Sequence, residues 1–335
     1  ILTFSHIWIF YFFIEYLNKQ NNNFESKKII IKIAILLSLA TGIQLYFPAT
    51  LIPLFFFGML EIFFLKKFIS INFNYKKLIK DIFFIFLIFY FIMIIFWVDA
   101  HNNILKLPVN LFLDSFNTDR GWKTNMINGN IYFSNTTPLH YILTLTIYKS
   151  PEYLLLLYIF FIFFYFSIQK FFAKNFKLFN HNLSLILSII FFPTFLLMIS
   201  PFQVYDGLRL FLWYVPYTVM IPALTAYYLL INYKILINKL ALLSTFVFFF
   251  FYLINFFGYT PFHYTYLNAL AGKPSEKNLR FVNDYWGTSL NELIKKIDDH
   301  EEIKNKKITV YSCGYNNQIL KKYIKNIKSN IILSD

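Results

Sequence analysis

Long runs of apolar residues constrain the fold of this chain more than any other feature. Each run is about 15–22 residues long, near the ~20 residues that an α-helix needs to cross a hydrocarbon core of about 30 Å. A spanning segment must satisfy its own backbone hydrogen bonds, so only helices fit these runs. The sequence therefore predicts an all-α polytopic membrane protein with about eight transmembrane helices, at residues 3–17, 29–46, 49–65, 81–98, 153–169, 183–200, 210–231 and 240–257.

The composition agrees with a membrane protein and excludes several other classes. Of the 335 residues, 58% are hydrophobic and only 14% are charged, against about 25% charged residues in a soluble domain. A soluble globule of this size cannot bury so much apolar surface. Disordered, fibrous, disulfide-based and cytosolic-enzyme classes are therefore excluded, and the single cysteine, Cys313, excludes an internal disulfide.

Lysines lie in alternate connections between the apolar segments, and this pattern predicts the orientation of the chain. By the positive-inside rule the lysine-rich connections are cytoplasmic. The loop at 99–152, the turn at 201–209 and the chain from residue 258 onward then lie outside. A net charge of +14 would suggest nucleic acid as the partner of a soluble protein. Here lysines in the cytoplasmic loops and in the C-terminal tail account for the positive charge. The predicted surroundings are therefore membrane lipids and not nucleic acid.

The change from apolar to polar composition near residue 258 divides the chain in two. Residues 1–258 are predicted to form the transmembrane domain, with its large outer loop at 99–152, and residues 259–335 an outer C-terminal segment. Apolar spacing within that segment predicts a small, partial α/β module. Its predicted elements are an amphipathic helix at 289–297, a strand at 307–313, a basic helix at 316–328 and the start of a second strand at 330–333.

The turn at residues 200–209 holds an acid and a base at the mouth of a helix. Asp206 and Arg209 lie three residues apart, and pairing with each other is one interpretation. The alternative is that Arg209 binds a lipid phosphate, because a guanidinium is always charged and binds phosphate bidentately. Placing a charged pair against the membrane costs free energy, so we consider a functional role for this pair.

Two further outer stretches combine aromatic and polar side chains. The loop at 114–141 is long, and long loops are rare unless they are functional or disordered. The stretch at 261–287 ends with a carboxylate beside two aromatic rings, an arrangement that suits sugar recognition. Both stretches also have a structural interpretation. The aromatic residues of the loop can anchor it at the membrane interface, and the later stretch can form a cap between the C-terminal tail and the membrane. The candidate binding residues are Trp122, His140 and Tyr141 in the loop, and Asp284 and Trp286 in the later stretch.

Several of these pieces together resemble GT-C membrane glycosyltransferases, of the type related to dolichyl-phosphate-mannose protein mannosyltransferases and bacterial lipid-A aminoarabinose transferases. The resemblance covers about residues 100–300 and depends on the order and spacing of short motifs. The matching pieces are Trp122, Asn128-Gly129, Pro138-Leu139-His140-Tyr141, Lys149-Ser150-Pro151, Tyr205-Asp206-Gly207-Leu208-Arg209, Tyr264-Thr265-Tyr266-Leu267-Asn268, Ala271-Gly272 and Asp284-Tyr285-Trp286-Gly287.

The resemblance implies an enzyme that transfers a sugar, with inversion, from a polyprenyl-phosphate donor to a lipid, glycan or protein acceptor on the outer face. It implies that Arg209 holds the donor phosphate and that Asp206 orients Arg209. His140, Tyr141 and Trp122 would line the cavity, while Asp284 and Trp286 would be structural or touch the acceptor. The family pattern and the composition favour a bacterial inner membrane with a periplasmic outer side. The sequence identifies no cofactor, and the resemblance allows a divalent metal.

One residue that the resemblance requires has no match in this chain. Such enzymes use an acid in their first outer loop as a base or metal ligand, whereas the connection at 47–48 is short and holds no acid. Since the chain starts at Ile1 within an apolar run, we expect the catalytic acid to lie upstream, and no catalytic residue is assigned here. Two alternatives stay open: a transporter or flippase, which would carry charged residues inside its spans or show two repeated halves, and a non-catalytic membrane remnant.

Overall fold

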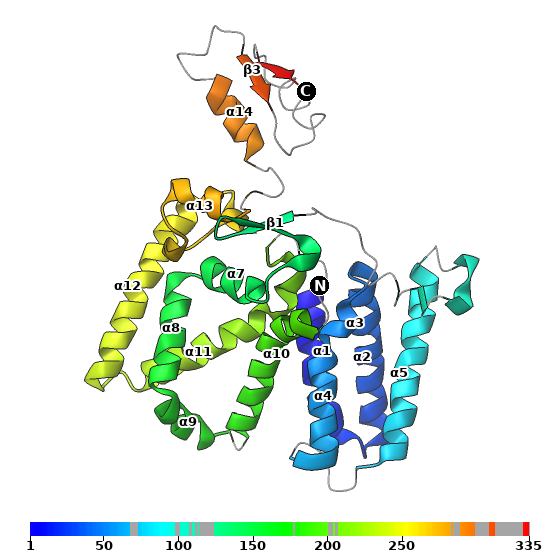
Figure 1. Cartoon of the computed structure of the whole chain (residues 1–335). Coiled ribbons are helices and arrows are strands. Elements are labelled where there is room, and N and C mark those ends of the chain that lie inside the picture. The colour runs from blue at the N-terminus through cyan, green and yellow to red at the C-terminus, as the bar shows by residue number, and fades with distance from the viewer. Residues whose placement is uncertain are drawn as a thin grey trace.

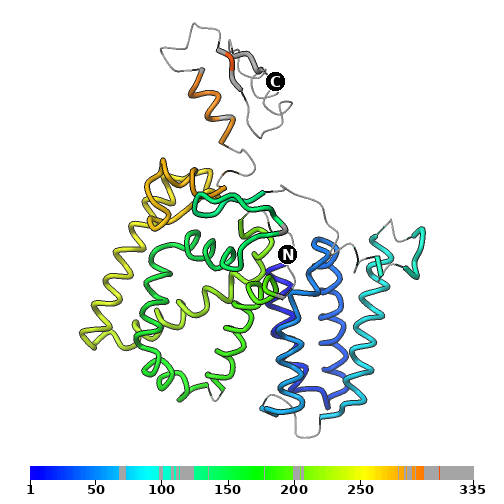
Figure 2. Tube along the Cα trace, viewed as in Figure 1, coloured from blue at the N-terminus to red at the C-terminus, as the bar shows by residue number. Residues whose placement is uncertain are grey.

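The computed structural model consists mostly of helices, arranged in two groups with a thin layer of short elements across one end (Figure 1). The chain passes from the first group through a β-hairpin into the second, and ends in a small α/β module (Figure 2). The described residues are 1–67, 73–97, 101–106, 109–110, 113, 124–176, 178–199, 204, 207–282, 284, 289–298, 308–311 and 331–334.

The first group packs around one apolar core. The helix α2 contacts both α1 and α5, and buried residues such as Leu17, Ile30 and Phe47 form the centre of the core. Asparagine caps begin two of the helices: Asn22 accepts from the backbone of α2, and Asn74 from that of α5. The elements are α1 (Leu2–Lys19), α2 (Asn23–Ile43), α3 (Phe47–Thr50), α4 (Ile52–Leu60), the π-helical turn η1 (Glu61–Leu65) and α5 (Tyr75–Phe96).

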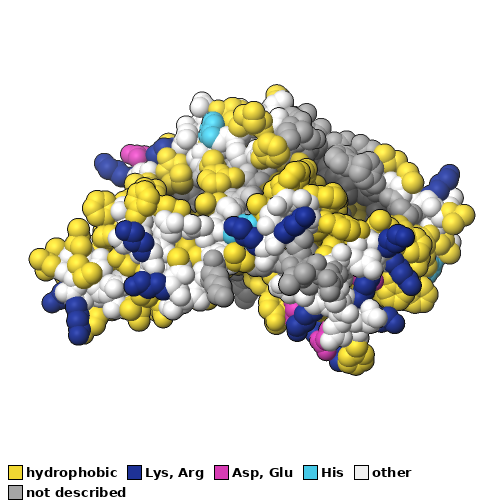
Figure 3. Space-filling model, turned by 90° about the horizontal axis from the view of Figure 1, so that it is seen from below, with side chains coloured by type: hydrophobic (Ala, Val, Ile, Leu, Met, Phe, Trp, Pro, Cys, Tyr) yellow, Lys and Arg dark blue, Asp and Glu magenta, His cyan; other side chains and the backbone are white. Residues whose placement is uncertain are grey.

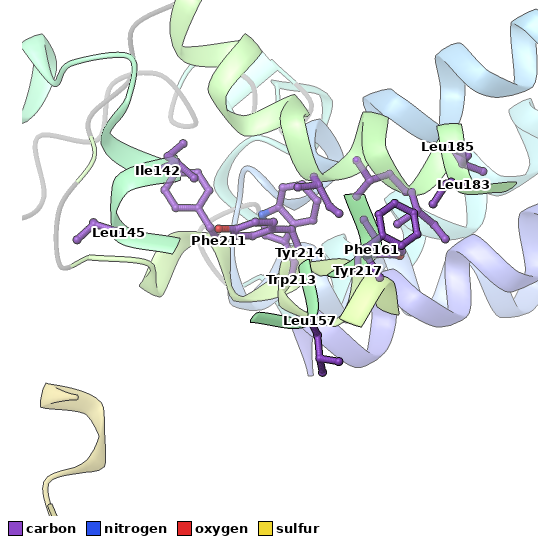
Figure 4. Packing of buried hydrophobic residues seen from close by; sticks show 14 of the residues in the cluster. Ile142, Leu145, Leu157, Phe161, Leu183, Leu185, Phe211, Trp213, Tyr214 and Tyr217 are labelled. Atoms are coloured by element: carbon purple, nitrogen blue, oxygen red, sulfur yellow. The ribbon is translucent and has the colours of Figure 1, made fainter. Parts of the chain in front are cut away.

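The second group packs around a larger core that is rich in aromatic rings. Figure 4 shows part of it, around Phe211, Trp213 and Tyr214. The axes of α7 and α8 differ by 113° across the short break between them, where Pro151 has a fixed φ and no N–H to continue the first helix. The elements are α7 (Tyr141–Lys149), α8 (Glu152–Phe163), α9 (Tyr165–Ala173), α10 (Phe179–Ile199), η5 (Arg209–Tyr214), α11 (Val215–Ile231) and α12 (Leu236–Gly258).

Within the described residues, five helical stretches are long and apolar enough to cross a membrane: 47–65, 75–96, 179–198, 209–231 and 236–258. The bent pair of α7 and α8 would make a sixth. The fold is therefore that of a helical membrane protein, but the predicted eight spans are not confirmed. Both α1 and α2 are helices, yet they carry polar and charged side chains such as Glu15 and Lys32. The predicted segment at 153–169 is interrupted at Phe164, between α8 and α9.

The helix ends alternate between two sides of the structure. The C-terminal ends of α1, α9 and α11 lie at the lower end in Figure 1, and the hairpin and α7 lie at the upper end. Figure 3 views the lower end and shows lysine and arginine side chains spread over it among apolar ones. This arrangement is compatible with the lysine pattern, while the side that faces the cytoplasm stays a prediction.

Short elements form the layer at the upper end. The strands β1 (Thr124–Ile127) and β2 (Asn130–Phe133) pair antiparallel, joined by Asn128 and Gly129, which both have positive φ as a tight hairpin turn requires. An isolated bridge joins Ile127 to Phe281. The remaining short helices are η3 (Ile104–Lys106), η4 (Ser134–Thr136), η6 (His263–Thr265), η7 (Ala269–Ala271) and α13 (Pro274–Arg280).

In the C-terminal module, the described residues form one helix and a two-stranded parallel sheet. The helix α14 (Leu290–Asp298) overlaps the predicted helix at 289–297, and the strand β3 (Ile308–Tyr311) falls within the predicted first strand at 307–313. The strand β4 (Ile331–Ser334) pairs with β3 so that Ile331 lies opposite Ile308. The basic helix predicted at 316–328 lies outside the described residues.

Candidate binding site at the α7–α8 corner

The structure describes only part of the predicted set of binding residues. Asp206, Trp122 and Trp286 lie outside the described residues, so the pairing of Asp206 with Arg209 stays a prediction. Arg209 is exposed at the first position of η5, and His140 is exposed at the N-cap of α7 without a side-chain capping bond.

Tyr141 joins α7 to the turn that precedes Arg209. Its ring is buried in the core of the second group, and its hydroxyl donates to the carbonyl of Gly207 at 3.5 Å. Gly207 has a φ of +63°, in the left-handed region that favours glycine, and a Cβ atom there would lie 3.3 Å from Cε of Lys149. The turn therefore lies against both ends of α7, and Tyr141 acts as a packing residue.

Lys149 contacts both Gly207, in the turn before Arg209, and Tyr264, in the stretch at 261–287. Its ammonium donates to the carbonyl of Tyr264 at 3.2 Å, while its stem lies beside Gly207. The hydroxyl of Tyr264 donates in turn to the carboxylate of Asp284. Asp284 also accepts from the backbone N–H of Ser289 at 3.1 Å, so it contributes to the start of α14. The predicted residues Tyr141 and Asp284 are thus linked through Lys149, which the sequence placed in a motif of the resemblance but not among the candidate binding residues.

A cavity of about 230 Å³ lies beside Lys149. This volume is below the roughly 300–1,000 Å³ of pockets for drug-sized ligands, so it suits one small head group. Most of the lining residues are aromatic, and Lys149 adds a positive charge. The lining residues are Lys149, Pro151, Tyr252, Phe256, Tyr259, His263, Tyr264 and Tyr266.

Two polar side chains hold the cavity wall against the corner. Glu152, at the start of α8, accepts from the Tyr266 hydroxyl and from the backbone N–H of Ala269, both at 2.8 Å. Asn268 is buried and donates through its amide to the carbonyls of Ile147 and Ser150, at 2.6 and 2.9 Å. The last carbonyls of a helix have no donor within the helix. The amide of Asn268 is the donor for these two carbonyls. These bonds fix the wall relative to Lys149.

Tyr266 gives a pH-dependent prediction. Burial, together with its hydrogen bond to Glu152, raises the pKa of the Tyr266 hydroxyl above its usual value of 10.0. The neutral phenol therefore stabilises the folded state fully below pH ~10, and this contribution is lost at higher pH because the unfolded chain ionises first. We expect Tyr266→Phe to remove part of the fall in melting temperature between pH 9 and 11. Identical alkaline profiles of variant and parent would contradict this expectation.

A second set of bonds ties the hairpin to this layer. The Arg280 guanidinium donates to the carbonyl of Ala271 and to the side chain of Asn128, both at 3.0 Å. The backbone N–H of Gly129 donates to the carbonyl of Arg280 at 3.1 Å, and Asn125 donates to the carbonyl of Val204. Short motifs that are far apart in the sequence therefore meet in one layer at the corner.

Within the described part of the chain, no group of three or more His, Cys, Asp or Glu side chains is placed to hold a metal ion. The divalent metal that the resemblance allows stays a prediction. In comparisons with known proteins, no family model, no curated protein and no solved structure matches this chain. The likeness to GT-C glycosyltransferases therefore depends on the motifs alone.

Proposed function

We propose that this chain forms the donor-binding part of a membrane glycosyltransferase. It would move a sugar from a polyprenyl-phosphate donor to a lipid, glycan or protein acceptor on the outer face of the membrane, with inversion. The observation that carries the proposal is the position of Lys149, in the lining of a mostly aromatic cavity and beside the turn that leads to Arg209. The proposal includes an orientation in a bacterial inner membrane with the upper end of Figure 1 on the periplasmic side.

The chemistry of such a transfer matches this arrangement. The bond between the anomeric carbon and a phosphate oxygen breaks, and the acceptor oxygen forms the new bond from the opposite face. The departing lipid phosphate keeps the electron pair, so fixed positive charge beside it stabilises the transition state. Lys149 and Arg209 supply that charge in the proposal. The base that takes the acceptor proton is not assigned to a residue of this chain.

A photoactivatable polyprenyl phosphate tests the proposal directly. With the protein in lipid nanodiscs, we expect Lys149→Gln and Arg209→Gln each to reduce cross-linking about tenfold or more, because a hydrogen bond to a charged group contributes roughly 1.5–3 kcal/mol. Lys234→Gln is the matched control, since this exposed lysine lies between α11 and α12 at the lower end. Unchanged cross-linking in both site variants would overturn the proposal.

A transporter or flippase is the second candidate, and one observation favours it. Glu61 is fully buried within the stretch at 47–65 and bonds to His181 of α10. Buried ionisable residues inside a membrane often mark transport pathways. Proteoliposomes that hold a fluorescent polyprenyl phosphate in one leaflet distinguish the two: a flippase equilibrates the lipid between leaflets, and a transferase leaves it in place.

A further inference from the structure

His6 of α1 joins the first helix group to the second. Its imidazole is fully buried, with Nε2 3.2 Å from the carbonyl oxygen of Thr50 and Nδ1 2.7 Å from the hydroxyl of Tyr217. Because a carbonyl can only accept, Nε2 carries the hydrogen, and in the neutral ring Nδ1 accepts from Tyr217. The imidazole also stacks on Trp213, with centroids 4.7 Å apart and planes inclined by 30°. One side chain of the first group therefore holds two residues of the second.

Two further side chains of the first group bond to η5 directly. The Tyr46 hydroxyl donates to the carbonyl of Leu210 at 3.2 Å, and the Thr3 hydroxyl donates to the carbonyl of Leu212 at 3.1 Å. A 3₁₀-helix has poorer hydrogen-bond geometry than an α-helix, and η5 has no side-chain capping bond at its N-cap, Leu208. Bonds from the first helix group therefore help to fix the position of η5.

The backbone of Arg209, the first residue of η5, is held from both sides. Before it, the carbonyl of Gly207 accepts from Tyr141 of α7 at 3.5 Å. After it, η5 receives the bonds from the first helix group. Trp213, on which His6 stacks, is only 3% exposed, so η5 cannot shift without disturbing a closely packed core. The two helix groups therefore determine the position of the Arg209 backbone together.

We infer that His6 is a positioning residue for Arg209, and that the first helix group holds η5 where the guanidinium meets the phosphate. The inference depends on the proposed function for the role of Arg209, and it adds the part that the first helix group plays in that site. His6 is buried away from any ligand and acts through Trp213 and Tyr217, which lie at the end of η5 and at the start of α11.

Hydrogen exchange of the full chain in lipid nanodiscs tests the hold on η5. We expect His6→Phe to speed exchange of the η5 amides about tenfold, the effect of one lost hydrogen bond of ordinary strength. The phenyl ring can still stack on Trp213, so this variant isolates the two bonds of the imidazole. Tyr46→Phe removes only a hydroxyl and should act in the same direction.

Tyr16→Phe is the matched control for these exchange measurements. Tyr16 also belongs to α1, and its hydroxyl donates to Asp81 of α5 at 2.7 Å, so the variant loses a bond within the first helix group and none to η5. We expect its η5 amides to exchange at the parental rate. Exchange of η5 in His6→Phe and Tyr46→Phe that is no faster than in Tyr16→Phe would overturn the inference.

Cross-linking to the photoactivatable polyprenyl phosphate tests the link between His6 and Arg209. We expect His6→Phe to reduce cross-linking about threefold or more, and to cause no further loss in a chain that already carries Arg209→Gln. A residue that only supports the fold would lower cross-linking by the same factor in both backgrounds, because independent effects add in free energy. Equal factors in the two backgrounds would therefore contradict the inference.

The two measurements distinguish failure of the inference from failure of the proposed function. If Arg209→Gln reduces cross-linking while η5 exchanges at the parental rate in His6→Phe, the inference fails and the proposed function stands. If η5 exchanges faster in His6→Phe while neither Arg209→Gln nor Lys149→Gln changes cross-linking, the first helix group does hold η5 and the proposed function fails.

Discussion

Replacing His181 with leucine will destabilise the protein by about 3–5 kcal/mol, because the substitution leaves a buried carboxylate without its partner. Glu61 is 0% exposed, and its carboxylate bonds to the His181 imidazole and to the backbone N–H of Lys67. Since Glu61 belongs to η1 and His181 to α10, this pair also joins the two helix groups. The bond from the Lys67 backbone N–H brings no positive charge to the carboxylate.

A double-substitution cycle with a matched control measures this effect. Unfolding of the purified protein by titration with sodium dodecyl sulfate gives the free energies. We expect the double variant Glu61→Leu/His181→Leu to be more stable than His181→Leu, because it removes the buried charge as well. Glu15→Gln is the control: it breaks an exposed pair with Lys19, and such pairs contribute about 0–1 kcal/mol. A loss in His181→Leu no larger than in this control would refute the prediction.

Replacing Glu152 with alanine will cost about 2–4 kcal/mol and will loosen the wall of the cavity. The change removes the acceptor of both the Tyr266 hydroxyl and the Ala269 N–H, in two part-buried bonds, and a donor left without a partner away from water costs about 1–3 kcal/mol. The negative charge at the start of α8 is also lost. We expect lower unfolding free energy together with faster proteolysis between residues 259 and 282.

The control for this prediction is Glu292, a carboxylate that also lies in the first turn of a helix but is not bonded to the cavity wall. Glu292 lies exposed in the first turn of α14, so Glu292→Ala removes little more than the interaction with the helix dipole, worth about 0.3–1 kcal/mol. The pair of variants therefore isolates the bonds to the cavity wall. Similar losses in both variants, or proteolysis that stays at the parental rate in Glu152→Ala, would show that Glu152 does not hold the wall.

The general architecture follows from the sequence, whereas several helix boundaries do not. Apolar runs of membrane length predict helices correctly, because no other structure satisfies the backbone inside a bilayer. Hydropathy places the second helix at 29–46, although α2 begins at Asn23, where Asn22 caps the polar first turn. The break at Phe164 lies inside an apolar run with no proline or glycine beside it. Tertiary packing determines such a boundary, so the local pattern of apolar and polar residues does not predict it.

The candidate site could be predicted only in part, since its bonds join distant residues. The sequence singled out Tyr141 and Asp284 for their types and positions. Lys149 stood only in a motif of the family resemblance, without a binding role, and Glu152 was missed. Both resemble ordinary residues at helix ends, and their partners lie 114 to 117 positions further along the chain. A single sequence carries no signal for such pairing. Glu61 was overlooked because one acid barely alters the hydropathy of its segment.

The bonds of Asn268 also impose an order on the biogenesis of the protein. Ser150 leaves the ribosome 118 residues before Asn268, so the carbonyls at the end of α7 have only water as a partner until α12 has been made. The corner between α7 and α8 can close only when the last long helix has been inserted. A nascent chain arrested before residue 268 should therefore lack the bonds that hold the cavity wall to the end of α7.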